Sequence, residues 1–277
     1  MKRYRTMNAD FDSSANILNL EIKDEWEAEV KASHKDAKKS VRESMQRNYG
    51  TSSYEAKEKN IIDIGSTFPS IIAFHNKFLN QSRAAFIVGG YYPAFTGITT
   101  LTERVLNHLV IALRDDFKLT PEYKKVHSKA SFTDWDEVIR ILEAWDILLS
   151  DSKPHVLKLK KLRHQYAAHF NPETDVKDRE FALEAILAFQ EFIRIQFGFF
   201  GMQPWFIPDT RGEFFIKQEF ETHPFVKRIY LPNCALVGPS HHFVMVEKEL
   251  KIVDDKYPDI EVSDKEFIRL REEAKNS

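Results

Sequence analysis

The sequence predicts a mainly α-helical protein in three parts. In chain order these are a polar N-terminal arm, a helical bundle and a small β-containing C-terminal appendage, over residues 1–59, 60–200 and 201–277. The bundle is predicted because residues 83–117 and 178–199 carry apolar side chains at steps of three and four, the spacing of one face of a buried helix. After Gly201 the apolar runs become short and are interrupted by Pro, Gly and Asn, which indicates strands joined by turns.

The N-terminal arm is predicted to hold one charged helix between polar segments. Residues 1–16 are polar and are expected to be loosely ordered, and residues 48–59 have the composition of a linker. Residues 17–47 combine an intermittent apolar stripe with many charges. A helix with so few core positions is either solvated or presents a basic surface to RNA or to a partner protein, and the sequence leaves both readings open.

The bundle is expected to begin with an apolar stretch, residues 60–80, in which Pro69 suits the first turn of a helix. His75 lies there among apolar residues, so we expect it to pack or to make a satisfied hydrogen bond rather than to hold a ligand. Further along, the Gly89-Gly90 pair should kink or divide the helical stretch. Residues 133–136 have the spacing of a capping box and predict the start of another helix, which should run to Leu149.

The appendage is predicted to contain several short strands and a final helix. The expected extended segments are residues 214–216, 226–231, 235–237 and 243–246. A charged helix with Ser263 as its cap should close the chain. Adjacent histidines on a strand, such as His241 and His242, point to opposite faces, and neither they nor His223 lie in a recognisable ligand spacing, so no metal site is expected.

Composition narrows the possible functions. The 277 residues include 40 basic and 42 acidic ones, a formal net charge of −2, so any contact with nucleic acid must be local. Cys234 is the only cysteine, which excludes internal disulfides and fits a reducing cytoplasm. The first residues lack the apolar core of a signal peptide, and no apolar stretch approaches the roughly 18 residues of a membrane span. Neither a Gly-rich phosphate loop nor a cofactor motif is present, so no cofactor is expected.

The candidate chemistry lies in residues 158–170. Arg163, His164 and His169 stand there among apolar and small residues, and Asn171-Pro172 ends the predicted helix. The planar guanidinium of arginine matches phosphate oxygens, and histidine, with a pKa of about 6.5, exchanges protons at neutral pH. Arg163 and His169 would be about 9 Å apart along the helix axis. This pair suits the cleavage of a phosphodiester.

One chain alone does not bring these two side chains together. Six residues at about 100° each leave Arg163 and His169 roughly 120° apart around an ideal helix. A two-fold axis beside the helix would place two arginines and two histidines in one cleft. A homodimer arranged in this way would have a composite site.

The pattern Arg163-His164-Gln165-Tyr166-Ala167-Ala168-His169 resembles the signature of the HEPN superfamily, which is Arg, four to six residues and His, usually with a polar residue directly after the Arg. The resemblance covers roughly residues 60–200. It implies an up-and-down helical bundle that dimerises. Many members are metal-independent endoribonucleases of toxin–antitoxin, abortive-infection and phage-defence systems, with RNA as substrate and, in some systems, an antitoxin or another defence protein as partner.

On this resemblance, Arg163 and His169 are the expected catalytic residues. His164 is expected to orient one of them or to contact RNA, and Glu103 matches the acidic residue that members often hold on a facing helix; the alternative for Glu103 is an ordinary ion pair. Asn107 and His108 are secondary candidates on the same helix. The expected RNA contacts, to single-stranded RNA or tRNA, are Lys160, Lys161 and Tyr166, with core packing as the alternative for Tyr166.

Two other readings remain open at this point. In the first, the helical region is a catalytically silent dimer that binds RNA, a nucleotide or a partner protein. In the second, the protein is a structural homodimer in which Arg163 only caps a helix C-terminus through backbone carbonyls.

Overall fold

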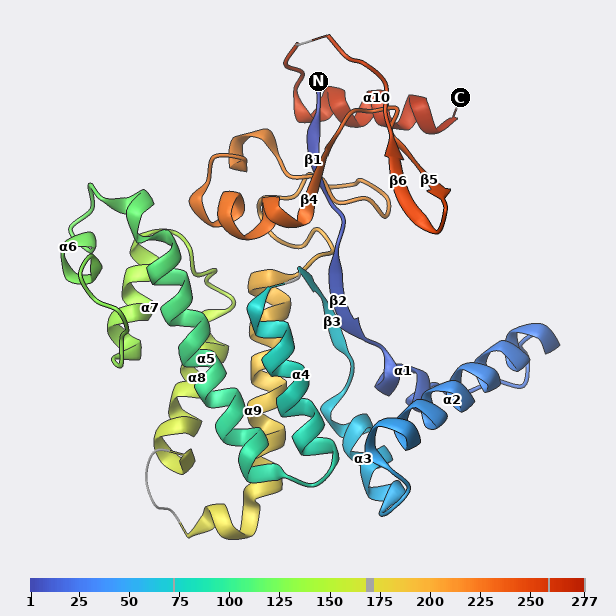
Figure 1. The fold of residues 1–277 in the computed structure, drawn as a ribbon, viewed down its shortest axis with the longest axis vertical. Helices are drawn as coiled ribbons and strands as arrows, with labels where there is room; N and C mark the ends of the chain where they lie inside the picture. Colours follow the sequence, from blue (N-terminus) through green and yellow to red (C-terminus); the bar gives the residue numbers. More distant parts are fainter. Residues whose placement is uncertain (72, 168–171, 259, 277) are drawn as a thin grey trace. The chain divides into compact units, whose positions relative to one another are not determined.

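The computed structural model describes residues 1–71, 73–167, 172–258 and 260–276 and divides the chain into two compact units (Figure 1). A helical unit comprises Asp10–Phe197. A smaller unit combines Met1–Ala9 with Gly198–Ser277. The sequence-based division assigned residues 1–59 to an arm of their own, whereas here the first nine residues belong with the C-terminal segment and the following ones with the helices.

The helical unit contains most of the helices of the protein, so the chain is mainly α. In chain order its helices and helical turns are α1 (Ser14–Asn19), α2 (Ala28–Tyr49), α3 (Tyr54–Ile64), α4 (Phe74–Ile87), α5 (Tyr91–Leu113), η1 (Arg114–Phe117), α6 (Tyr123–Val126), α7 (Trp135–Ala144), α8 (Lys153–Leu162), η2 (Arg163–Ala167) and α9 (Glu173–Phe197). Strands β2 (Ala9–Asp12) and β3 (Thr67–Ile71) pair beside them.

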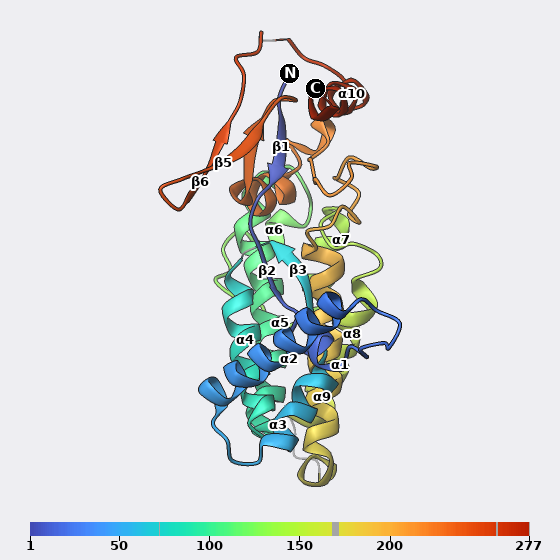
Figure 2. The same ribbon diagram turned by 90° about the vertical axis from the view of Figure 1, so that its right-hand side faces the viewer.

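Helix α5 is the centre of the helical unit. It packs against α4, α9, α7 and α8, and α4, α5 and α9 lie side by side in both views (Figures 1 and 2). Its fully buried residues include Ile98, Leu101, Val105 and Leu109, which follow the predicted steps of three and four. Gly89, with φ +87°, lies in the turn that separates α4 from α5, so the predicted division at this glycine pair is confirmed.

The start of the bundle differs from the prediction. Residues 48–59 are not a linker, because α3 begins at Tyr54, directly after Ser53 with its φ of +51°. Pro69 lies in β3 instead of the predicted first turn of a helix. Proline is tolerated in β3 because a strand of a two-stranded sheet has one unpaired edge.

α7 begins where the capping-box spacing predicted a helix, but its cap is Asp134 and not Thr133, the first residue of that spacing. Asp134 is its N-cap, and the Oδ1 atom of its side chain accepts hydrogen bonds from the backbone N–H groups of Asp136, at 2.9 Å, and Glu137, at 3.3 Å. The helix ends at Ala144, five residues before the predicted Leu149, because Asp146 adopts a φ of +54° that no α-helix continues through.

The smaller unit is built on short antiparallel strand pairs. Its strands are β1 (Arg3–Thr6), β4 (Cys234–Val237), β5 (His242–Val246) and β6 (Glu249–Val253), and its helical elements are η3 (Gln218–Phe220), η4 (Val226–Tyr230), η5 (Leu231–Asn233) and α10 (Asp264–Asn276). β1 pairs with β4 and β5 with β6, both antiparallel. A small apolar core of Ile207, Phe215, Val237 and Phe267 lies in this unit.

Two of the four predicted strands of the appendage are confirmed, as β4 and β5. Residues 214–216 form only isolated bridges, through Phe215 and Ile216. The prediction for residues 226–231 is wrong, since η4 is helical there. The predicted cap of the last helix is confirmed, because the Ser263 hydroxyl oxygen accepts a hydrogen bond from the backbone N–H of Glu266 at 3.2 Å.

A buried charge cluster ties β1 into the smaller unit. The Glu213 carboxylate accepts two hydrogen bonds from the Arg271 guanidinium, at 2.7 and 3.0 Å, and also pairs with Arg5 of β1 at 2.9 Å and Lys275 at 2.8 Å. These cationic partners outweigh the effect of burial and hold the pKa of Glu213 at about 2. The first residues of the chain are thus fixed by partners more than 200 positions away.

Candidate functional site

Helix α8 carries the candidate arginine at its C-terminal end. Pro154 lies in the first turn of α8, where its missing N–H leaves no bond unmade, and Val156, Leu159 and Leu162 are buried along one face. Arg163 follows directly and opens η2, a π-helical turn that packs against α5. Such turns are rare and are found frequently at functional sites.

Three elements meet at the Arg163 guanidinium. Its Nη2 atom lies 3.0 Å from the Glu103 Oε2 atom of α5, and its central carbon lies 5.7 Å from the centre of the Trp135 ring of α7. The Arg163 side chain keeps 38% of its surface exposed and that of Glu103 keeps 23%. The guanidinium is therefore held in one place by a carboxylate and an aromatic face, while part of it stays open to solvent.

Glu103 and Arg163 are the predicted site residues that the structure brings together. Glu103 lies on α5 and Arg163 follows α8, so this ion pair joins two helices and is not a pair within one helix. The second predicted catalytic residue, His169, lies outside the described residues. Trp135 was not predicted as a site residue, because a tryptophan directly after a helix cap does not by itself indicate a contact with an arginine.

The loop before α7 is fixed by a residue of α5. The Asn107 side-chain amide donates to the Phe132 carbonyl at 2.9 Å and accepts from the Phe132 backbone N–H at 2.6 Å. This two-way bond holds the start of α7, and with it Trp135, against α5. The His108 ring instead packs at a tilt against Phe74, with ring centres 4.5 Å apart and 53° between the planes, and burial lowers the pKa of His108.

The residues predicted to contact RNA differ in their surroundings. Lys160 forms an ion pair with Asp136, whereas Lys161 is exposed. His164 is exposed on the same turn as Arg163. The Tyr166 ring stacks on Phe181 of α9, with ring centres 3.6 Å apart and an angle of 17° between the planes. This intramolecular stack favours the core-packing alternative for Tyr166.

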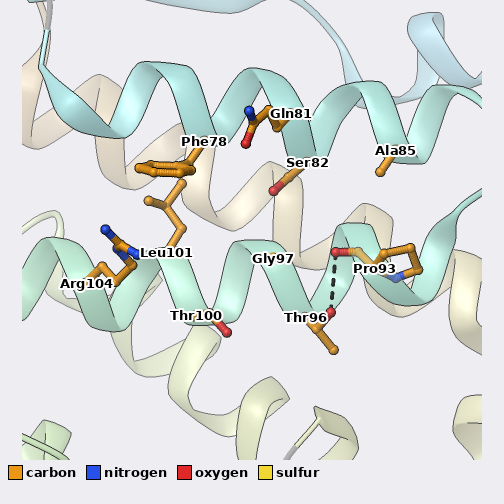
Figure 3. A pocket seen from close by; sticks show the side chains of 10 residues that line it. All are labelled: Phe78, Gln81, Ser82, Ala85, Pro93, Thr96, Gly97, Thr100, Leu101 and Arg104. Atoms are coloured by element: carbon orange, nitrogen blue, oxygen red, sulfur yellow. Dashed lines mark hydrogen bonds between the residues drawn. The ribbon is translucent and has the colours of Figure 1, made fainter.

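A groove lies between α4 and α5 (Figure 3). It has a volume of about 460 Å³ and an apolar floor that includes Ala85, Gly97 and Leu101. At one end the Arg104 guanidinium lies over the Phe78 ring, 4.9 Å from its centre. The groove combines an apolar floor with one cation.

The structure adds two observations about metals and membranes. Within the described ranges, no three His, Cys, Asp or Glu side chains are grouped so that they could hold a metal ion. No helix of the part of the chain that the structure describes is both long and apolar enough to cross a bilayer.

Comparison of the chain with models of protein families, with curated proteins and with solved structures found no match.

Proposed function

We propose that this protein is a metal-independent endoribonuclease that acts in the cytoplasm as a homodimer, with Arg163 and His169 as its catalytic residues. One observation carries the proposal. The Arg163 guanidinium is fixed by Glu103 and Trp135 at the start of a π-helical turn and yet keeps 38% of its side-chain surface exposed. An arginine that is both held and accessible is suited to bind a phosphate.

The proposed reaction breaks one phosphodiester bond by internal attack. His169, as general base, takes the proton of a ribose 2′-OH, and the 2′ oxygen attacks the neighbouring phosphorus. The bond from phosphorus to the 5′ oxygen breaks, and a protonated histidine returns a proton to that oxygen. Arg163 holds the phosphate and stabilises its additional negative charge. The products are a 2′,3′-cyclic phosphate and a 5′-hydroxyl end.

A homodimer completes this set of groups. The reaction needs a base, an acid and a cation, and each chain offers one Arg163 and one His169. Two chains related by a two-fold axis would supply a second histidine from the same short motif. The resemblance to the HEPN superfamily favours a role in phage defence or as a toxin, with an antitoxin or another defence protein as a further partner.

The experiment that tests the proposal is cleavage of single-stranded RNA or tRNA by purified protein in the presence of EDTA. We expect Arg163→Ala and His169→Ala each to abolish cleavage, and Glu103→Gln to lower kcat because Arg163 loses the carboxylate that positions it. Arg140→Ala and His127→Ala are matched controls on exposed residues and should retain activity. Equal activity in the wild type and both catalytic variants would refute the proposal.

A second candidate function is supported by the charges around the site. Arg163 is paired with Glu103 and Lys160 with Asp136, so two of the cations expected to meet RNA already have carboxylate partners within the chain. A catalytically silent dimer that binds RNA, a nucleotide or a protein needs no free arginine. This function predicts that the purified protein binds RNA but does not cleave it. The contacts of the Arg163 guanidinium are with the side chains of Glu103 and Trp135, whereas the backbone N–H of Arg163, at the C-cap of α8, bonds to the Leu159 and Lys160 carbonyls.

A further inference from the structure

Helix α2 is the most exposed long helix of the helical unit. It has 22 residues, of which only Met45 is buried. Its packing partners include the short helix α1, and Arg42 pairs with Glu58 of α3 at 2.8 Å. In Figure 1, α2 runs outward from this attachment, and α4 and α9 lie between it and α8. A helix with so little buried surface contributes little to the core, so its sequence is free to serve another purpose.

The charges of α2 are sorted by face. The helix contains six Lys or Arg residues and three acidic ones. At about 100° per residue, five of the cations fall within an arc of about 100°, and the acidic residues lie outside that arc. The five are Lys31, Lys35, Lys38, Lys39 and Arg42. We call this set the α2 basic face.

Three lysines of the α2 basic face have no ion-pair partner among the described residues. Lys35, Lys38 and Lys39 form no ion pair with any residue that the structure describes. The pKa of Glu58 is lowered mainly by the hydrogen bond from Arg42, and the charge of Lys38 adds a smaller effect. Together with Arg42, Glu43 and Gln46 the three lysines line a shallow concavity of about 390 Å³. Glu43 is the one acidic residue of this lining, so the cations outnumber it and repel each other, and a polyanion would relieve that repulsion.

The composition of α2 favours a nucleic acid over other anionic partners. A helix that binds a membrane surface carries Trp, Phe or Leu on its apolar face, and α2 contains none of these. Protein interfaces are depleted in lysine, whereas phosphate backbones are bound by lysine and arginine. From Lys31 to Arg42 the basic face is about 16 Å long, and one strand of a duplex carries about five phosphates over that length.

We propose that the α2 basic face binds the phosphate backbone of RNA and anchors the substrate at a distance from Arg163. The choice of RNA over DNA rests on the proposed ribonuclease function. Backbone contacts carry no sequence information, so the anchoring is independent of RNA sequence. Its effect is to raise the local concentration of RNA at the site and not to change the chemical step.

The test compares two triple variants in binding to a fluorescent single-stranded RNA whose riboses are 2′-O-methylated, which cannot be cleaved by 2′-OH attack. The first variant is Lys35→Gln/Lys38→Gln/Lys39→Gln. The matched control removes the same charge from exposed lysines of the other unit, as Lys248→Gln/Lys251→Gln/Lys256→Gln. Circular dichroism should show both variants folded, because all the substituted side chains lie outside the core.

Each single-strand phosphate contact contributes about 0.7 to the slope of log affinity against log salt concentration. We therefore expect the α2 variant to lower this slope by about 2, while the control leaves it unchanged. Between about 50 and 200 mM salt the wild type should lose about 20-fold more affinity than the α2 variant. Equal slopes for wild type and α2 variant would overturn the inference, as would α2-dependent binding to vesicles of anionic lipid but not to RNA.

The outcome is separable from the fate of the proposed function. If cleavage is never observed, yet the α2 variant binds methylated RNA with the lowered slope, the anchoring stands and the nuclease proposal fails. If the wild type cleaves RNA and the α2 variant binds with an unchanged slope, the nuclease proposal stands and the anchoring fails. Because the proposed contacts are to phosphates, single-stranded DNA should bind with the same α2 dependence, and cleavage of DNA in place of RNA would overturn the choice of RNA.

Discussion

Replacing the buried histidine of α4 tests how burial controls protonation in this fold. His75 is fully buried in the first turn of α4, with its ring centre 4.7 Å from that of Phe197. Neither of its ring nitrogens has a hydrogen-bond partner among the described residues. Burial, and next the charge of the nearby His108, lower the pKa of His75 to about 3. The predicted packing role therefore holds, without the hydrogen bond that was its alternative.

The sign and size of the effect on stability follow from this shift. In the unfolded chain His75 takes up a proton near pH 6.5, but in the folded protein only near pH 3. The unfolded state therefore binds more protons in this window, and the free energy of unfolding falls as the pH drops below about 6.5. At about pH 5 the loss due to His75 is about 2 kcal/mol.

The variant His75→Phe keeps an aromatic ring and removes the titration. We expect the free energy of unfolding, measured by urea denaturation with tryptophan fluorescence, to fall less between about pH 7.5 and pH 5 in the variant than in the wild type, by about 2 kcal/mol. His127→Phe changes an exposed histidine and should keep the full pH dependence. An identical pH dependence for wild type and His75→Phe would refute the reasoning, since His75 would then titrate normally in the folded state.

Three further predictions concern stability and reactivity. Glu213→Gln leaves the buried Arg271 without its carboxylate and should lower the free energy of unfolding by about 3 kcal/mol. The wild type should lose stability as the pH falls from about 4.5 towards 2, because Glu213 is then protonated, and the variant should not show this loss. Asp134→Ala removes the cap of α7 and should cost about 1 kcal/mol in the same urea assay. Burial raises the pKa of the Cys234 thiol to about 12, so a thiol reagent at neutral pH should label it only after urea unfolds the smaller unit; rapid labelling of the folded protein would contradict this.

The elements that the sequence predicted are those with local causes. The buried face of α5 follows from a period of 3.6 residues, and the start of α7 from a side chain that caps the next backbone N–H groups. The strands were harder to predict because their partners are distant. β3 pairs with β2, and β1 pairs with β4, more than 200 residues further along the chain. A strand of four or five residues carries too little pattern to reveal such a partner.

The candidate site, too, was only partly predictable from the sequence. A basic motif near a helix end was visible in the sequence, and Arg163 does lie at the end of α8. Its pairing with Glu103 was an expectation from resemblance and not from spacing, because the two residues are 60 positions apart. The contact with Trp135 depends on how α7 packs against α5, which Asn107 controls through its bonds to the preceding loop. Tertiary packing of this kind has no local signature.

The ion pair between Arg163 and Glu103 determines how the two proposals fit together. A paired guanidinium attracts RNA only weakly, and the whole chain carries a net charge of −2, so long-range attraction must come from another surface. The α2 basic face has three lysines that form no ion pair within the described part of the chain, and it can provide this attraction. Variants of α2 should therefore raise KM and leave kcat unchanged, whereas Glu103→Gln should lower kcat and, by releasing Arg163, tighten RNA binding. If both sets of variants changed the same kinetic parameter, binding and chemistry would share one surface and the division between α2 and Arg163 would be wrong.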